Sequence, residues 1–359
     1  MISKKQWILL LVLFFIALII HFISASPSWV ENAYSLSFYN YISGFLRMIF
    51  GWIPFSIGDI LYTIGVVWIL KKGYKFSKAV INKKISVAAV KIFFYKISVQ
   101  LLFIYCLFNF LWGINYDRKG IADQLGLGST KYSVNELRNI DSLLLIKVNE
   151  CKYAIVQKPP IVISSKDIFN GSVDAYKEVN KEHSFIQYNF RSVKSSLWGW
   201  LGNYIGFTGY YNPFTGEAQV NTTVPIFLQP YTTCHEIAHQ LGYAKENEAN
   251  FVGYLAASSS KDSLFKYSVY LDLFIYANRS LARVDSISAK NFAKQILPAV
   301  KTDLAEWKKF AMDHQNPIEP RVRWMYGKFL ENNAQPKGIL SYDEVTALLI
   351  AYYKKYGSI

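Results

Sequence analysis

Two histidines and a glutamate within five residues form the segment of this chain that is best suited to chemistry. They are His235, Glu236 and His239. Residues four apart lie on the same face of a helix, so His235 and His239 can bind one metal ion through their imidazoles. Glu236 would then lie beside a zinc-activated water and act as the general base. The spacing therefore predicts a Zn²⁺ site that hydrolyses a substrate.

A catalytic zinc needs a third protein ligand and an open position for water. The metzincin spacing HExxHxxGxxH is excluded, because Lys245 stands where its third His would be. Glu246 and Glu248 remain, and they lie about 200° apart around a helix, so only one of them can face the metal. Asn250 follows Glu246 by four residues on the same face, where it can orient a His ligand. We predict Glu246 as the ligand with Asn250 behind it, and Glu248 as the alternative.

The composition indicates a membrane protein. Hydrophobic residues make up 52% of the chain and charged residues only 18%, which is more apolar than an ordinary soluble domain. Three segments, about 7–23, 49–70 and 97–113, are long enough to cross a bilayer. The first also fits a signal peptide, but the two later spans favour an uncleaved anchor. Pro54 and Asp59 weaken the second span, and we expect Asp59 to face a neighbouring helix or the membrane interface.

Lysines between the second and third spans predict the orientation of the chain in the membrane. Residues 71–96 contain eight Lys and no acidic residue, which places this loop in the cytoplasm. Everything after about residue 114 is then extracytoplasmic. The formal charge of +14 is concentrated beside apolar segments, so it indicates contact with the lipid bilayer and no nucleic acid. We predict a transmembrane region, 1–113, and an outer domain, 114–359.

The outer domain is predicted to be mainly helical with one hairpin. Ser133 and Ser341 each begin a capping box before an apolar run. Residues 204–211 and 217–224 have the alternation and turn residues of a hairpin. In zinc peptidases of the HExxH class an edge strand before the metal-binding helix commonly pairs with the substrate, and 216–221 is the candidate. Helices are expected at about 134–148, 167–181, 228–241, 246–259, 263–281, 288–313, 318–332 and 342–355.

Two features of the site are left open by the sequence. Cys151 and Cys234 both lie in the outer domain, where an oxidising compartment would permit a disulfide. A hydrolase also needs a donor for the developing oxyanion, and the segments that supply it are not fixed by spacing. The possible donors are Tyr267, Tyr270, His183, His314 and Arg321.

Parts of the sequence resemble known proteins. Glu246 through Asn250 resembles the ExxxD motif that supplies the third ligand of gluzincins, although Asn replaces Asp and the Glu lies closer to HExxH than usual. Nearly the whole chain resembles an uncharacterised family of bacterial membrane proteins with three N-terminal spans and a C-terminal HExxHxxGxxxExEAN segment. Residues 53–59, 209–217 and 235–251 carry this resemblance. The resemblance implies a gluzincin-like zincin domain anchored in the bacterial inner membrane. Members of the family are identified as zinc peptidases by their motif only.

The expected fold is therefore a mainly α membrane protein with three N-terminal transmembrane helices and an α+β zincin-like metallopeptidase domain. The expected function is zinc-dependent hydrolysis of peptide or amide bonds, in a peptide, protein or peptidoglycan-type substrate. An intramembrane protease is excluded, because polar residues surround the motif. The alternative is a non-enzymatic membrane-anchored sensor or assembly factor with a structural zinc. A structural site has no need of a general base, so Glu236 favours the enzyme.

Overall fold

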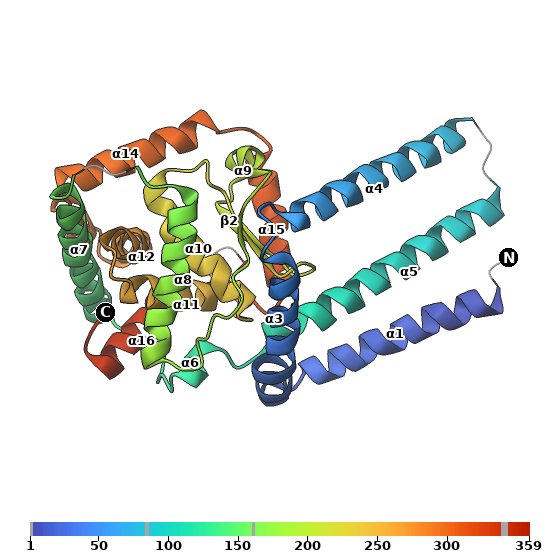
Figure 1. Cartoon of the computed structure of the whole chain (residues 1–359), viewed down its shortest axis with the longest axis horizontal. Helices are drawn as coiled ribbons and strands as arrows, with labels where there is room; N and C mark the ends of the chain where they lie inside the picture. Colours follow the sequence, from blue (N-terminus) through green and yellow to red (C-terminus); the bar gives the residue numbers. More distant parts are fainter. Residues whose placement is uncertain (1–2, 83–85, 160–161, 339–343) are drawn as a thin grey trace.

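The computed structural model describes residues 3–82, 86–159, 162–338 and 344–359. This part of the chain is mainly helical and contains three short strands. Figure 1 shows a body of packed helices from which three long helices, α1 (Lys4–Ser24), α4 (Ile57–Ile81) and α5 (Val87–Leu111), project in one direction. The expected mainly helical fold is confirmed.

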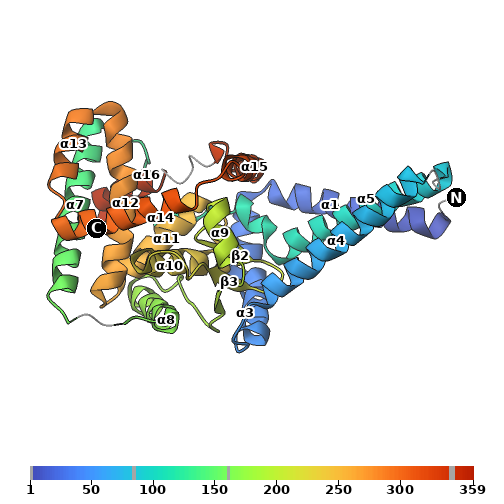
Figure 2. The same cartoon turned by 90° about the horizontal axis from the view of Figure 1, so that it is seen from above.

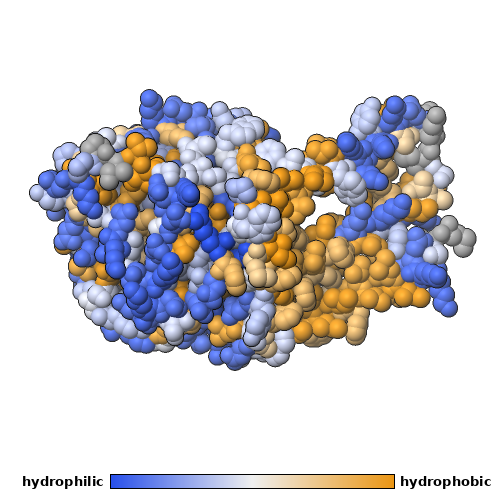
Figure 3. Space-filling model, viewed as in Figure 1, coloured by the Kyte–Doolittle hydropathy of each residue, from blue (hydrophilic) through white to orange (hydrophobic). Residues whose placement is uncertain are grey.

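Two of the projecting helices, α1 and α5, are long and apolar enough to cross a membrane. The 21 residues of α1 rise about 30 Å, which matches the hydrocarbon core of a bilayer. Few residues of either helix are buried, unlike those of a core helix in a soluble protein. Figure 3 shows a hydrophobic zone along the helices, between the hydrophilic body and hydrophilic tips. α4 projects beside them but is less apolar, because it carries Asp59 and four lysines.

The second predicted span, 49–70, is wrong at its start. α3 (Tyr39–Phe50) ends there, and α4 begins seven residues later at Ile57. The hydroxyl of Ser56 caps α4 by accepting the backbone N–H of Asp59 at 3.0 Å, and Pro54 lies in the link. Hydropathy could not separate the two helices, because the link itself is apolar.

The segment between α1 and α4 packs onto the body. It contains α2 (Pro27–Trp29), the π-helical η1 (Val30–Phe38) and α3. The hydroxyl of Tyr39 donates to the carbonyl of Gln240 at 3.0 Å, and that of Ser43 donates to the same carbonyl at 2.8 Å. Residues close to the N-terminus therefore hold the C-terminal end of the helix that carries His235 and His239.

A three-stranded sheet lies next to this helix. Its order is β1 (Val193–Ser195), β3 (Glu217–Val220), β2 (Gly209–Asn212), with β3 parallel to β1 and antiparallel to β2. The predicted hairpin is confirmed by the pairing of β2 with β3. The choice of 216–221 as the edge strand is wrong, since β3 is central and the edge strands are β1 and β2. The strand β1 has only three residues and gave no alternation that a sequence pattern could detect.

The N-terminus of α4 docks on this sheet. The carboxylate of Glu217 accepts the backbone N–H of Gly58 at 2.6 Å, where it satisfies a free donor and the positive end of the helix. The carboxylate of Asp59 accepts the N–H of Leu197 at 2.7 Å and the hydroxyl of Tyr210. Asp59 is thus buried against the sheet and not against a neighbouring membrane helix.

The helices of the body agree closely with those expected. The region 288–313 forms two helices because Pro298 begins the second. α7 (Val134–Val156) continues past its expected end at 148, and the unexpected α9 (Gly199–Ile205) occupies the start of the strand expected at 204–211. The capping box at Ser133 is confirmed, whereas the one expected at Ser341 lies outside the described residues. All three cysteines are free, so Cys151 and Cys234 do not pair. The body helices are α6 (Ile121–Gln124), α7 (Val134–Val156), α8 (Ser165–Glu182), α9 (Gly199–Ile205), α10 (Gln229–Gln240), α11 (Glu246–Ser259), α12 (Ser263–Val284), α13 (Ser286–Lys294), α14 (Pro298–Asp313), α15 (Glu319–Asn332) and α16 (Val345–Tyr356).

Candidate metal centre

A tight turn between α10 and α11 creates the site. Gly242 has a φ of +84°, a left-handed conformation that glycine adopts without strain. A Cβ at this position would also lie 2.9 Å from the side chains of Asn115 and Tyr39. The chain can therefore reverse here only with glycine, and the reversal brings the first residue of α11 back against α10.

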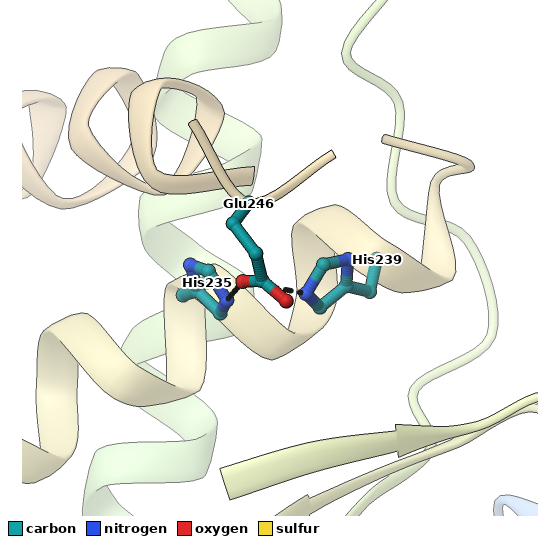
Figure 4. A group of neighbouring side chains, drawn as sticks. All are labelled: His235, His239 and Glu246. Carbon is teal, nitrogen blue, oxygen red and sulfur yellow. Dashed lines mark ion pairs between the residues drawn. The ribbon is translucent and has the colours of Figure 1, made fainter. Parts of the chain in front are cut away.

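The reversal brings together the three residues predicted as metal ligands. The Oε2 atom of Glu246 lies 3.2 Å from Nε2 of His235 and 3.6 Å from Nε2 of His239. One ligand atom from each of the three residues lies within 4.8 Å of the others, and all three side chains are buried. Figure 4 shows the carboxylate of Glu246 between the two imidazoles.

Glu248, the alternative third ligand, faces another part of the molecule. Its Oε1 lies 3.8 Å from Nζ of Lys245. Its carboxylate packs against Gly120, where an added Cβ would collide with it. Of the two glutamates left open by the sequence, the fold brings only Glu246 to the histidines.

Backbone contacts fix the orientation of one histidine. The Nδ1 of His239 lies 2.8 Å from the carbonyl of Tyr243. A proton on Nδ1 would make this hydrogen bond and leave the Nε2 lone pair facing Glu246. The indole N–H of Trp112 donates to the carbonyl of His239 at 3.1 Å and supports the same residue from the base of α5.

Asn250 shows no such contact with the other histidine. Within the described ranges, the Nδ1 of His235 and the Nδ2 of Asn250 are both buried without a hydrogen-bond partner. The backbone carbonyl of Asn250 instead accepts the hydroxyl of Tyr231 at 3.0 Å. The orienting role of Asn250 therefore stays a prediction.

The unpaired atoms of the centre fit a metal ion. Oε2 of Glu246 is buried without a hydrogen-bond partner in the described part of the chain, which is costly for a carboxylate. Burial raises the pKa of Glu246, but the adjacent His235 and His239 outweigh it and hold the pKa well below its ordinary value. Two imidazoles and one carboxylate form a donor set of catalytic zinc, and other divalent transition metals accept it too.

Glu236 lies between the centre and the edge strand β2. A Cβ on Gly209 would come within 2.6 Å of Oε1 of Glu236, so the strand approaches this closely only because residue 209 is glycine. Oε2 of Glu236 is buried without a partner among the residues described. Burial is the largest influence on this carboxyl group and raises its pKa to about 7, although the nearby histidines lower it.

The edge strand β2 has backbone groups near Glu236 that β3 does not pair. The N–H of Asn221 donates to the carbonyl of Thr208 at 2.8 Å, and Gly209 pairs with Val220 in the antiparallel register. Hydrogen-bonded and non-hydrogen-bonded pairs alternate along such a ladder. The N–H and C=O groups of Gly209 and Tyr211 therefore point away from β3, where an extended peptide can pair with them.

A tyrosine that no sequence pattern indicated contacts the centre. The hydroxyl of Tyr326, on α15, donates to Oε1 of Glu246 at 2.5 Å. Gln335, just after α15, accepts the backbone N–H of Glu246 at 2.9 Å. Both lie at least 80 residues from Glu246 in the chain, so no local spacing could have identified them. The proposed oxyanion donors Tyr267, Tyr270 and His314 make their hydrogen bonds elsewhere, with Asp303, Ile359 and Phe310.

Tyr326→Phe should weaken metal binding without unfolding the protein. The change removes only the hydroxyl that holds Oε1 of Glu246, and loss of a hydrogen bond to a metal ligand costs about 10-fold to 100-fold in affinity. Competition with a chelating zinc indicator measures the Kd. The control is Tyr153→Phe on α7, where the side chain is exposed. Equal Kd values for the two variants would show that Tyr326 does not support the metal ligand.

Comparison with known proteins places most of the chain in one family. A family model described as "Protein of unknown function (DUF3810)" matches residues 34–350. The match extends from η1 to α16 and includes His235, His239 and Glu246. No curated protein and no solved structure matches the chain. The chain therefore belongs to the DUF3810 family.

Proposed function

We propose that the protein is a membrane-anchored zinc metallopeptidase that hydrolyses peptide or amide bonds. The observation that carries the proposal is the position of Glu236. Its buried, unpaired carboxylate lies next to the three candidate ligands and against the edge strand. A base is needed between a metal and a bound substrate, and this is where a peptide paired with β2 would pass.

Each residue then has a defined task. His235, His239 and Glu246 hold the metal, with Tyr326 and the carbonyl of Tyr243 holding two of these ligands. When bound, zinc supplies a Lewis acid that activates water and polarises the scissile carbonyl. Glu236 accepts a proton at its carboxylate and returns it to the leaving amine. The backbone groups of Gly209 that β3 does not pair align the peptide.

The rival proposal is a non-enzymatic sensor or assembly factor with a structural metal. Structural zinc sites usually have four protein ligands, and catalytic sites have three. Within the part of the chain that the structure describes, the group consists of three residues. A structural site also gives no reason for a buried carboxylate at Glu236. Both features support the enzyme.

A membrane topology with three spans accompanies the proposal. The N-terminal end of α1, the end of α4 and the start of α5 lie at the tips of the projecting helices, away from the body (Figure 1). Lysines are concentrated at these tips. By the positive-inside rule the tips face the cytoplasm, and the body with its metal centre lies outside a bacterial inner membrane.

Metal removal tests the proposed activity directly. The full chain, purified in detergent, is expected to bind about one zinc and to cleave peptides in a proteome digest, with products identified by mass spectrometry. A chelator should abolish cleavage, and stoichiometric Zn²⁺ should restore it, because the ligands alone provide no nucleophile. A metal-loaded protein that cleaves nothing under these conditions would favour the structural role.

A further inference from the structure

The helix α15 (Glu319–Asn332) presents an unusual surface for a soluble domain. Trp324 is 65% exposed and Met325 is 64% exposed, and Phe329 one turn later is also exposed. Only Gly327 and Leu330 of this helix are buried. Exposed apolar side chains grouped on one helix indicate a surface that binds something apolar.

The position of α15 identifies what it faces. Figures 1 and 2 show α15 at the border between the body and the projecting helices, running across their direction. The ring of Phe329 packs edge-on against Tyr116, which follows α5 by five residues, with 6.3 Å between centroids. The exposed face of α15 thus lies at the level where α1 and α5 leave the body.

The residue types on α15 are those that favour the interface between a membrane and water. Tryptophan and tyrosine prefer the region between lipid headgroups and acyl chains, because their rings are apolar at one end and polar at the other. Arg321 and Arg323 are exposed in the first half of the helix, where they can reach lipid phosphates. A helix with these features lies in the plane of the interface.

The same helix covers the metal centre. Tyr326 lies next to Met325 in sequence, yet its hydroxyl reaches Oε1 of Glu246 at 2.5 Å. Gln335, three residues after α15, binds the backbone N–H of Glu246. One helix therefore carries both the exposed apolar surface and the contacts that cover a metal ligand.

We propose that α15 is an interfacial membrane helix, with Trp324 and Met325 inserted into the bilayer surface and Tyr326 linking that surface to the metal centre. The metal centre then lies just above the lipid headgroups. If the proposed hydrolase function holds, the substrate is a peptide that is itself attached to, or emerges from, the same membrane.

Quenching by spin-labelled lipid tests the location of α15 without measuring activity. Met325→Cys in the full chain, with the half-exposed Cys151 changed to Ser, is labelled with bimane and placed in nanodiscs of phosphatidylcholine and phosphatidylglycerol. A tenth of the lipid carries a nitroxide at a shallow acyl position. The control is Ile287→Cys, at a residue that is 73% exposed. Its helix, α13, lies at the end of the body away from the projecting helices in Figure 2.

We expect the label at position 325 to be quenched at least about threefold more than the label at 287, because nitroxide quenching requires proximity to lipid. Trp324→Cys provides a second labelled position should Met325→Cys fold poorly. Equal quenching at 325 and 287 would overturn the proposal. A label at 325 that is shielded from water but unquenched by lipid would also overturn it, and would indicate that a second copy or another protein covers α15. Neither result depends on whether the protein hydrolyses peptides.

Discussion

Glu236→Gln is expected to abolish peptide hydrolysis while the protein keeps its metal. The amide preserves the size of the side chain beside Gly209 but cannot accept the proton. Removal of a general base typically costs about 10²–10⁴ in rate, so cleavage of a peptide mixture should fall at least 100-fold. Mass spectrometry of the products measures the rate, and elemental analysis measures the zinc.

The matched control for this change is Glu306→Gln on α14. Its side chain is exposed on the body and far in sequence from the centre, so both rate and zinc content should stay at wild-type values. This variant also controls for contaminating peptidases carried through the same purification. Undiminished cleavage by Glu236→Gln would remove Glu236 from the mechanism.

The second large effect is expected for the third ligand. Glu246→Gln replaces an anionic ligand with a neutral amide between His235 and His239. Changes to residues behind a metal ligand cost about 10-fold to 100-fold in affinity, so loss of the carboxylate itself should raise the Kd for zinc more than about 100-fold. Chelator competition monitored by a zinc indicator covers this range.

Glu248→Gln serves as the comparison, because this residue lies two positions away and is also buried. Its carboxylate faces Lys245 and Gly120, so the Kd should change less than about threefold. The reverse order of the two effects would show that α11 presents Glu248 to the metal and that the geometry of Figure 4 does not hold in solution.

Local sequence patterns predicted most of what the centre needs. His235, Glu236 and His239 lie on one helix, so helical periodicity was sufficient to group these three residues. Glu246 begins the next helix, and the turn at Gly242 brings it back to the histidines. The apolar runs that form α1 and α5 are equally local. The helix that carries Glu246 was also predicted from its own residues, with bounds that match α11.

What could not be predicted depends on contacts between distant segments. The parallel pairing of β1 with β3 makes β3 central and leaves β2 at an edge, and no pattern within either strand encodes that choice. Tyr326 reaches Glu246 from 80 residues away. The start of α4 was misplaced for a similar reason, because Asp59 is accommodated by the sheet and not by the apolar residues around it.

The docking of α4 on the sheet has a consequence for how the protein must be produced. The carboxylate of Glu217 accepts the N–H of Gly58, and the carboxylate of Asp59 accepts the N–H of Leu197. Lys194 Nζ donates to the carbonyl of Gly51 at 2.8 Å. A fragment that starts at residue 114 would lack the backbone N–H of Gly58 that Glu217 accepts and the backbone carbonyl of Gly51 to which Lys194 donates. We therefore expect the segment before α4 and the first turn of α4 to stabilise the body, so that a truncation at residue 114 folds less stably than the full chain.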